Sequence, residues 1–155
     1  MTSQEFHALC NRIFTEYGFV KKGKDYYIDL GSDIVGSIHF QKSNYGKAIY
    51  LNCGFSLKNS SDYIPYPKRT ETNMSWRIAV PGREKLANKP DNYEYSTEMI
   101  EYGRYNQNEM ETFIKNEIDT WVIPAIKNGM SYILLHEEMY RIMLKIARVL
   151  HKIPE

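Results

Sequence analysis

The chain has 155 residues, of which 43% are hydrophobic and 25% charged, and its formal net charge is +1 at pH 7. This length and composition suit a single packed domain over residues 1–155 and exclude wholesale disorder. A near-neutral chain creates no global field that would recruit nucleic acid or an acidic membrane, so neither is expected as a partner. The distinctive feature is the 13 tyrosines, against 6 phenylalanines and 2 tryptophans, because tyrosine favours half-buried surfaces and interfaces.

The sequence also bears on compartment and redox chemistry. It has no run of about 18 apolar residues that would span a membrane, and residues 1–11 lack the positive and apolar regions of a signal peptide. The two cysteines, Cys10 and Cys53, do not make a disulfide framework and lie within apolar patterns, so we expect buried, reduced thiols. We therefore expect a cytoplasmic protein.

The first predicted element is a helix that begins near Thr2. Thr2 and Glu5 match a capping box, and Gly18 is placed to end the helix. The apolar residues with helical spacing on one face are Phe6, Leu9, Cys10, Ile13, Phe14 and Tyr17. A basic loop at residues 21–24 follows.

A meander of strands comes next. The segments with a period of two are residues 25–30, 34–41 and 49–57, and the first has Tyr26, Ile28 and Leu30 on one face. The alternation predicts an antiparallel meander with one face on a core and one wetter face. Residues 76–80 are a candidate fourth strand that ends at Pro81, and a short strand near 93–96 is compatible with the sequence.

Two helices are predicted to close the chain. The first spans about 110–125 and contains Pro124, which predicts a kink or break near Ile123. The second spans about 132–150, and its predicted core-facing residues are Leu135, Met139, Ile142, Met143, Ile146, Val149 and Leu150. Because strands and helices are segregated, we predict an α+β fold, an antiparallel four- to five-stranded meander sheet packed by an N-terminal helix and two C-terminal helices.

Charge is uneven along the chain although its sum is near zero. Residues 1–90 have 13 Lys and Arg against 8 Asp and Glu, a net of +5. Residues 91–119 have 2 against 8, a net of −6, and residues 120–155 have 5 against 3, a net of +2. The acidic block either pairs with the basic half inside the fold or forms an acidic patch for a basic partner.

Several short motifs resemble those of one family. They are Gly18-Phe19 ahead of Lys21-Lys22-Gly23, Phe40-Gln41-Lys42-Ser43 at a strand end, Asn52 with Gly54 in the next strand, and Val122-Ile123-Pro124 in a late helix. Together they are similar to the bacterial domain-of-unknown-function family 4304, over roughly residues 5–130. The resemblance implies a small bacterial cytoplasmic α+β domain. Because this family has no agreed activity, it implies no catalytic residue.

A cluster of polar side chains is predicted on the second face of the meander. If the period of two holds, His39 and Gln41 lie near Tyr50 and Asn52 across the turn at residues 44–47. One interpretation is a polar binding floor, with His39 as an acid, base or ligand contact. The other is an ordinary solvent face or a buried hydrogen-bonded network.

Other chemical signatures are weak. His136 and Glu137 begin like a zinc-protease helix, but the second histidine is absent, so no metal is expected. The chain has no GxSxG or CxxC motif, and we predict no catalytic residue and no cofactor. Residues 21–24 do not match a P-loop, and with Lys42 and Lys47 they form either a cationic surface for nucleic acid or a solvated turn.

The leading hypothesis is a non-enzymatic protein-interaction module, such as an immunity-like or accessory factor. It would use the sheet face and the tyrosine-rich segments 59–73 and 89–107, since long loops rich in Tyr and Arg are typical of interfaces. The candidate partner-binding residues are His39, Gln41, Tyr50, Asn52, Trp76, Arg77, Tyr93 and Tyr95. The alternative is a small-molecule-binding protein or enzyme, with a pocket around His39, Gln41, Tyr50 and Asn52.

Overall fold

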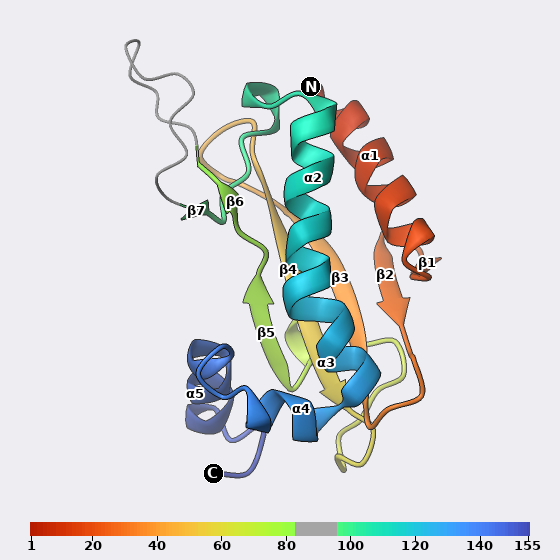
Figure 1. The fold of residues 1–155 in the computed structure, drawn as a ribbon, viewed down its shortest axis with the longest axis vertical. Helices are drawn as coiled ribbons and strands as arrows, with labels where there is room; N and C mark the ends of the chain where they lie inside the picture. Colours follow the sequence, from red (N-terminus) through yellow and green to blue (C-terminus); the bar gives the residue numbers. More distant parts are fainter. Residues whose placement is uncertain (83–95) are drawn as a thin grey trace.

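The computed structural model describes residues 1–82 and 96–155 and contains a five-stranded antiparallel sheet with helices on one face (Figure 1). The order of strands in the sheet follows the chain. The strands are β1 (Val20–Lys22), β2 (Asp25–Ile28), β3 (Ile34–Lys42), β4 (Ile49–Leu57) and β5 (Met74–Arg77), and β6 (Val80–Pro81) forms a separate pair with β7 (Ser96–Thr97). The predicted α+β meander is confirmed.

Helix α1 (Ser3–Glu16) begins and ends as the sequence predicts. The Glu5 backbone N–H donates to the Thr2 hydroxyl at 3.1 Å, and the Thr2 N–H donates to the Glu5 carboxylate at 3.2 Å. Beyond the helix, Gly18 adopts a φ of 98°, which glycine accepts without strain. The face of α1 that is buried in the core consists of Phe6, Leu9, Cys10, Ile13 and Phe14.

The pairing of β3 with β4 defines the two faces of the sheet. Ile38 lies opposite Cys53, and His39 lies opposite Asn52, so neighbouring residues point to opposite faces. The face with Ile38 and Cys53 contributes to the core beneath the helices. Cys10 and Cys53 are both buried thiols, as expected, and burial raises the pKa of each.

The second face of the sheet is more buried than the alternation predicts, because residues 58–73 fold over part of it. The Tyr27 hydroxyl donates to the Pro67 carbonyl at 3.0 Å, and the Leu57 N–H donates to the Asn73 side-chain oxygen at 2.8 Å. A Cβ on Gly54 would lie 2.5 Å from Thr72 Cγ2, so the loop approaches the strand closely enough to require glycine. The polar side chains that become buried on this face are Ser37, His39, Asn52 and Ser56.

The helical segment after the sheet changes its geometry close to the predicted position. Helix α2 (Gln107–Glu117) begins with an Asn106–Glu109 capping box and passes into a π-helical turn (Ile118–Val122). Helix α3 (Ile123–Asn128) then carries Pro124 in its first turn, where the missing N–H is tolerated. The π-helical turn ends at Val122 and α3 begins at the next residue, so the disturbance predicted near Ile123 takes the form of a π-helical turn and not of a break in the helix.

The prediction of one continuous last helix over residues 132–150 is wrong. The structure has α4 (Met130–Leu135) and α5 (Arg141–Val149), because His136 leaves helical geometry at φ −108° and ψ 40°. This break lets α5 bury Met143, Leu144 and Ala147. Five residues predicted to face the core are instead exposed: Leu135 (81%), Ile142 (70%), Val149 (66%), Leu150 (57%) and Ile146 (51%). None of the helices in residues 1–82 and 96–155 combines the length and apolar character that crossing a membrane requires.

Several strand boundaries also differ from the predictions. The basic segment predicted as a loop begins inside β1, and Leu30 is exposed because β2 ends at Ile28. The candidate strand 76–80 is divided between β5, which starts earlier at Met74, and β6. Of the predicted strand 93–96, Ser96 begins β7, whereas residues 93–95 lie outside the described residues.

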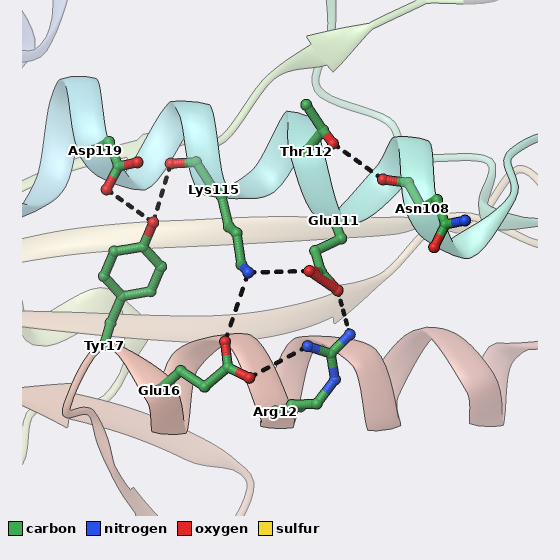
Figure 2. Close-up of polar contacts among 8 residues, drawn as sticks. All are labelled: Arg12, Glu16, Tyr17, Asn108, Glu111, Thr112, Lys115 and Asp119. Atoms are coloured by element: carbon green, nitrogen blue, oxygen red, sulfur yellow. Dashed lines mark hydrogen bonds and ion pairs between the residues drawn. The ribbon is translucent and has the colours of Figure 1, made fainter.

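Part of the acidic block pairs with the N-terminal helix (Figure 2). Glu111 on α2 binds Arg12 on α1 and also Lys115, one turn further along α2, at 2.9 Å. These two cations hold the pKa of the Glu111 carboxyl at about 2. The Tyr17 hydroxyl donates to the Asp119 carboxylate at 2.8 Å. At Glu111 the acidic block is therefore paired within the fold rather than presented to a partner.

The contact between Gly54 and Thr72 yields a stability prediction. Gly54→Ala should lower the free energy of unfolding by about 2 kcal/mol, because the new methyl group must displace the loop from the second sheet face. Gly103→Ala is the matched control, since a Cβ there would meet only the Met1 carbonyl at 3.8 Å. Urea unfolding measures both. Equal stability of the two variants would contradict the close packing of the loop.

Candidate functional site

Three of the predicted floor residues and Arg77 form one polar cluster. The Asn52 amide donates to the Gln41 side-chain oxygen at 3.1 Å, and Arg77 donates to Gln41 at 3.2 Å and to Asn52 at 3.4 Å. The Arg77 guanidinium also lies 3.8 Å from the centre of the Tyr50 ring. The strands β3, β4 and β5 each contribute to this cluster, so it follows from the sheet register.

His39, the fourth predicted floor residue, lies opposite Asn52 in register but forms its hydrogen bonds with other residues. Its Nδ1 lies 2.9 Å from an Asp25 carboxylate oxygen, and its Nε2 lies 3.1 Å from the Ser37 hydroxyl. The Tyr27 ring packs against it edge-on, and only 4% of the residue is exposed. Because both ring nitrogens are occupied and the ring is buried, His39 is not presented to a ligand in this structure.

The remaining predicted residues lie at the β5 edge or outside the description. Trp76 faces the helices, opposite Cys53 in register, and its ring packs 4.7 Å from that of Phe55. Arg77 points to the other face, and both residues reach a cleft beside the strand. Tyr93 and Tyr95 lie outside the described residues.

This cleft, which we call the α5–β5 cleft, lies where β5, the end of α2 and the start of α5 meet. Its volume is about 530 Å³, within the range of ligand sites. The lining residues are Ser75, Trp76, Arg77, Ala79, Ser96, Glu98, Glu117, Trp121, Glu138, Met139, Tyr140, Arg141, Ile142, Met143 and Ile146. Sequence reasoning identified Trp76 and Arg77 here but missed Glu117 and Trp121.

Glu117 is the unusual group in the α5–β5 cleft. It is half-buried, and within the described chain its carboxylate has no hydrogen-bond or ion-pair partner. Burial raises the pKa of this carboxyl to about 7. An unpaired carboxylate in such a place costs stability and provides no structural contact in return, and such groups are enriched at functional sites.

Local structure explains why Glu117 lies there. It is the last residue of α2, immediately before the π-helical turn, and such turns often occur at functional sites. Trp121 follows one turn later, and its carbonyl accepts a hydrogen bond of 2.8 Å from the Tyr140 hydroxyl. The Trp121 and Tyr140 rings meet edge-on at 5.6 Å. This contact attaches the turn before α5 to the π-helical turn and closes one wall of the cleft.

A second cleft tests the predicted cationic surface. Lys21, Lys24 and Lys42 line a space of about 750 Å³ between α1 and the sheet, whereas Lys47 lies in a different cleft. These lysines are exposed, and the polar groups at the base already have partners. The Tyr26 hydroxyl donates to Asn11 at 2.7 Å. Unlike the half-buried Glu117 in the α5–β5 cleft, the described polar residues His7, Asn11 and Tyr26 at the base of this cleft all have hydrogen-bond partners.

Metal chemistry has no assembled centre in the described part of the chain. Within residues 1–82 and 96–155, no three His, Cys, Asp or Glu side chains gather closely enough to hold a metal ion. Among its described lining residues, the α5–β5 cleft instead has two tryptophans, three glutamates and two arginines, of which Arg77 extends its guanidinium to the polar cluster on the other sheet face. That combination suits recognition of a charged organic group.

Comparison with known proteins places the chain in a family but supplies no activity. The family described as "Domain of unknown function (DUF4304)" matches residues 10–128. No curated protein and no solved structure matches the chain.

The position of Glu117 predicts a pH-dependent cost to stability. Its pKa is about 7 in the folded protein and 4.5 ordinarily, so the folded state holds more protons between these values. The contribution of Glu117 to the free energy of unfolding therefore falls as the pH rises from about 4.5 to 7, and it stays constant above pH 7. The free energy of unfolding of Glu117→Gln should equal that of the parent near pH 4.5. At pH 8 it should be higher by about 1 kcal/mol, a value reduced for solvent screening.

Urea unfolding at the two pH values measures this difference. Glu155→Gln is the matched control, because Glu155 is exposed and its substitution removes the same charge. The control should show the same stability difference from the parent at both pH values. A Glu117→Gln variant that is no more stable than the parent at pH 8 would contradict the prediction.

Proposed function

The chain belongs to the DUF4304 family, and we propose that it is a non-enzymatic protein-interaction module of the bacterial cytoplasm. An immunity-like or accessory factor would have this role. The docking surface that we propose differs from the tyrosine-rich sheet face, because residues 58–73 cover part of that face and Tyr27 is buried beneath them. It lies on α5.

The observation that carries this proposal is an exposed apolar stripe on α5. Ile142, Ile146, Val149 and Leu150 have the spacing of one helical face, and each is more than half exposed. Soluble proteins rarely keep four large aliphatic side chains together in water, and such patches mark interaction sites. We call these four residues the α5 stripe.

Charges beside the α5 stripe define the chemistry of the partner. Arg141 and Lys145 are exposed on the same helix and have no carboxylate partner in the described chain, whereas Arg148 is paired with Glu137 at 2.8 Å. A matching partner offers an apolar face flanked by carboxylates. We infer an amphipathic helix with an acidic margin, packed along α5.

A small-molecule pocket around His39, Gln41, Tyr50 and Asn52 is less well supported. His39 is buried and hydrogen-bonded at both nitrogens, and Gln41 and Asn52 are satisfied by each other and by Arg77. None of these four residues lines the α5–β5 cleft. The polar cluster therefore supports a structural role for them.

The proposal predicts that one substitution in the α5 stripe abolishes partner binding. Ile146→Glu places a carboxylate at the centre of the apolar face, and it should weaken binding at least 100-fold while leaving the fold intact. Leu30→Glu is the matched control, because Leu30 is an exposed aliphatic residue in a different part of the fold. Each protein is used as bait, and a protein retained by the parent and control is then purified for calorimetric titration.

Two results would contradict the proposal. One is a purified partner that binds the parent and Ile146→Glu with equal affinity. The other is a different occupant of the α5 stripe. A second copy of the chain would give a dimer in sedimentation that Ile146→Glu dissociates, and a membrane surface would give anionic vesicles that bind the parent but not the variant. An acidic amphipathic partner helix that requires Ile146 supports it.

A further inference from the structure

The α5 stripe and the α5–β5 cleft are continuous. Ile142 and Ile146 belong to the stripe and also line the cleft, so a helix packed along α5 lies over the mouth of the cleft. A side chain of that helix can therefore enter a space walled by Trp76 and Trp121. This step rests on the proposed function, because it assumes that the stripe is the docking surface.

The chemistry of the cleft selects a cation. Trp76 and Trp121 are the two tryptophans of the chain, and indole faces attract ammonium and guanidinium groups more strongly than other rings do. Three glutamates, the exposed Glu98 and Glu138 and the half-buried Glu117, are among the described lining residues, and this acidic lining disfavours an anion. The cleft therefore complements a long basic side chain, with its aliphatic stem against the aromatic walls and its charge near a carboxylate.

The charged groups around Glu117 leave its carboxylate uncompensated. The charged and titratable residues that line the cleft with it come from several elements. They are Arg77 in β5, Glu98 after β7, Glu138 and Tyr140 in the turn before α5, and Arg141, the first residue of α5. Neither arginine is within ion-pair distance of Glu117 in the structure, and burial alone accounts for the direction of its pKa change. An external cation would relieve the cost of ionising this carboxylate.

We propose that the α5–β5 cleft binds a lysine or arginine side chain of the docked partner, held between Trp76 and Trp121 and paired with Glu117. The partner helix thus combines an apolar face, an acidic margin and one basic residue that extends beyond it. The apolar face supplies most of the affinity. The basic residue fixes the register of the helix, because the cleft lies beside Ile142 and Ile146 and not beside Val149 or Leu150.

The test uses the native fluorescence of the protein, since both tryptophans of the chain line the cleft. The probe is N-acetyl-lysine N-methylamide, and N-acetyl-norleucine N-methylamide is its uncharged counterpart. At pH 8 the lysine probe should change the emission saturably, with a dissociation constant of about 10 mM, and the norleucine probe should not. Affinity for the lysine probe should be about tenfold lower at pH 6, where Glu117 is mostly protonated.

Variants assign the effect to the carboxylate. Glu117→Gln keeps the shape of the side chain, and it should weaken lysine-probe binding about tenfold at pH 8 and remove the difference between pH 8 and pH 6. Glu155→Gln should behave as the parent does. Equal responses to the lysine and norleucine probes, or an unchanged pH profile in Glu117→Gln, would overturn the inference.

The two proposals fail in distinguishable ways. If the cleft does not bind the cation but Ile146→Glu still abolishes partner binding, the inference is wrong and the docking surface remains. If the cleft binds the lysine probe but partner binding does not depend on Ile146, the proposal of a docking surface on α5 is wrong. The proposal that the partner supplies the cation is then wrong as well. When the purified partner binds, the tryptophan fluorescence should change. Replacing the partner's basic residue by an uncharged one should abolish this change, whereas exchanging lysine for arginine, or arginine for lysine, should preserve it.

Discussion

The proposed docking surface depends on the hydrogen bond from the Tyr140 hydroxyl to the Trp121 carbonyl, because this bond joins the turn before α5 to the π-helical turn. Met143, Leu144 and Ala147 are buried beyond that point, and the opposite face of α5 is left in solvent. Trp121, held by the same bond, forms a wall of the α5–β5 cleft. The exposed stripe and the cleft are thus two consequences of one packing arrangement.

Sequence periodicity predicted the elements whose burial is decided locally. The helical spacing in α1 and the alternation in β3 and β4 each have one apolar face, so only one orientation buries it. Helix α5 has apolar residues over more of its circumference, and of the neighbours Ile142 and Met143 the first is exposed and the second is buried. Periodicity cannot choose between two apolar faces. The choice depends on the break at His136 and on contacts with distant parts of the chain.

The candidate site shows the same division between local and non-local information. The register of a hairpin is enough to bring Gln41 near Asn52, and the polar cluster was predictable to that extent. The burial of His39 and its contact with Asp25 were not, because they depend on a residue of another strand and on the cover formed by residues 58–73. Glu117 gave no signal at all: a carboxylate beside an apolar stripe normally points to water, and only the fold shows that this one is half-buried.

Two features that reduce the stability of the isolated chain lie side by side. The α5 stripe leaves aliphatic surface in water, and Glu117 places a carboxylate where it has no counterion within the described chain. Glu117 and the four residues of the α5 stripe could all be substituted without disturbing the core, since none of them belongs to it. A partner that covers Ile142 and Ile146 and supplies a cation would relieve both costs in one binding event. Their coincidence at one cleft is therefore the strongest physical reason to look for the function of this protein at α5 rather than on the sheet.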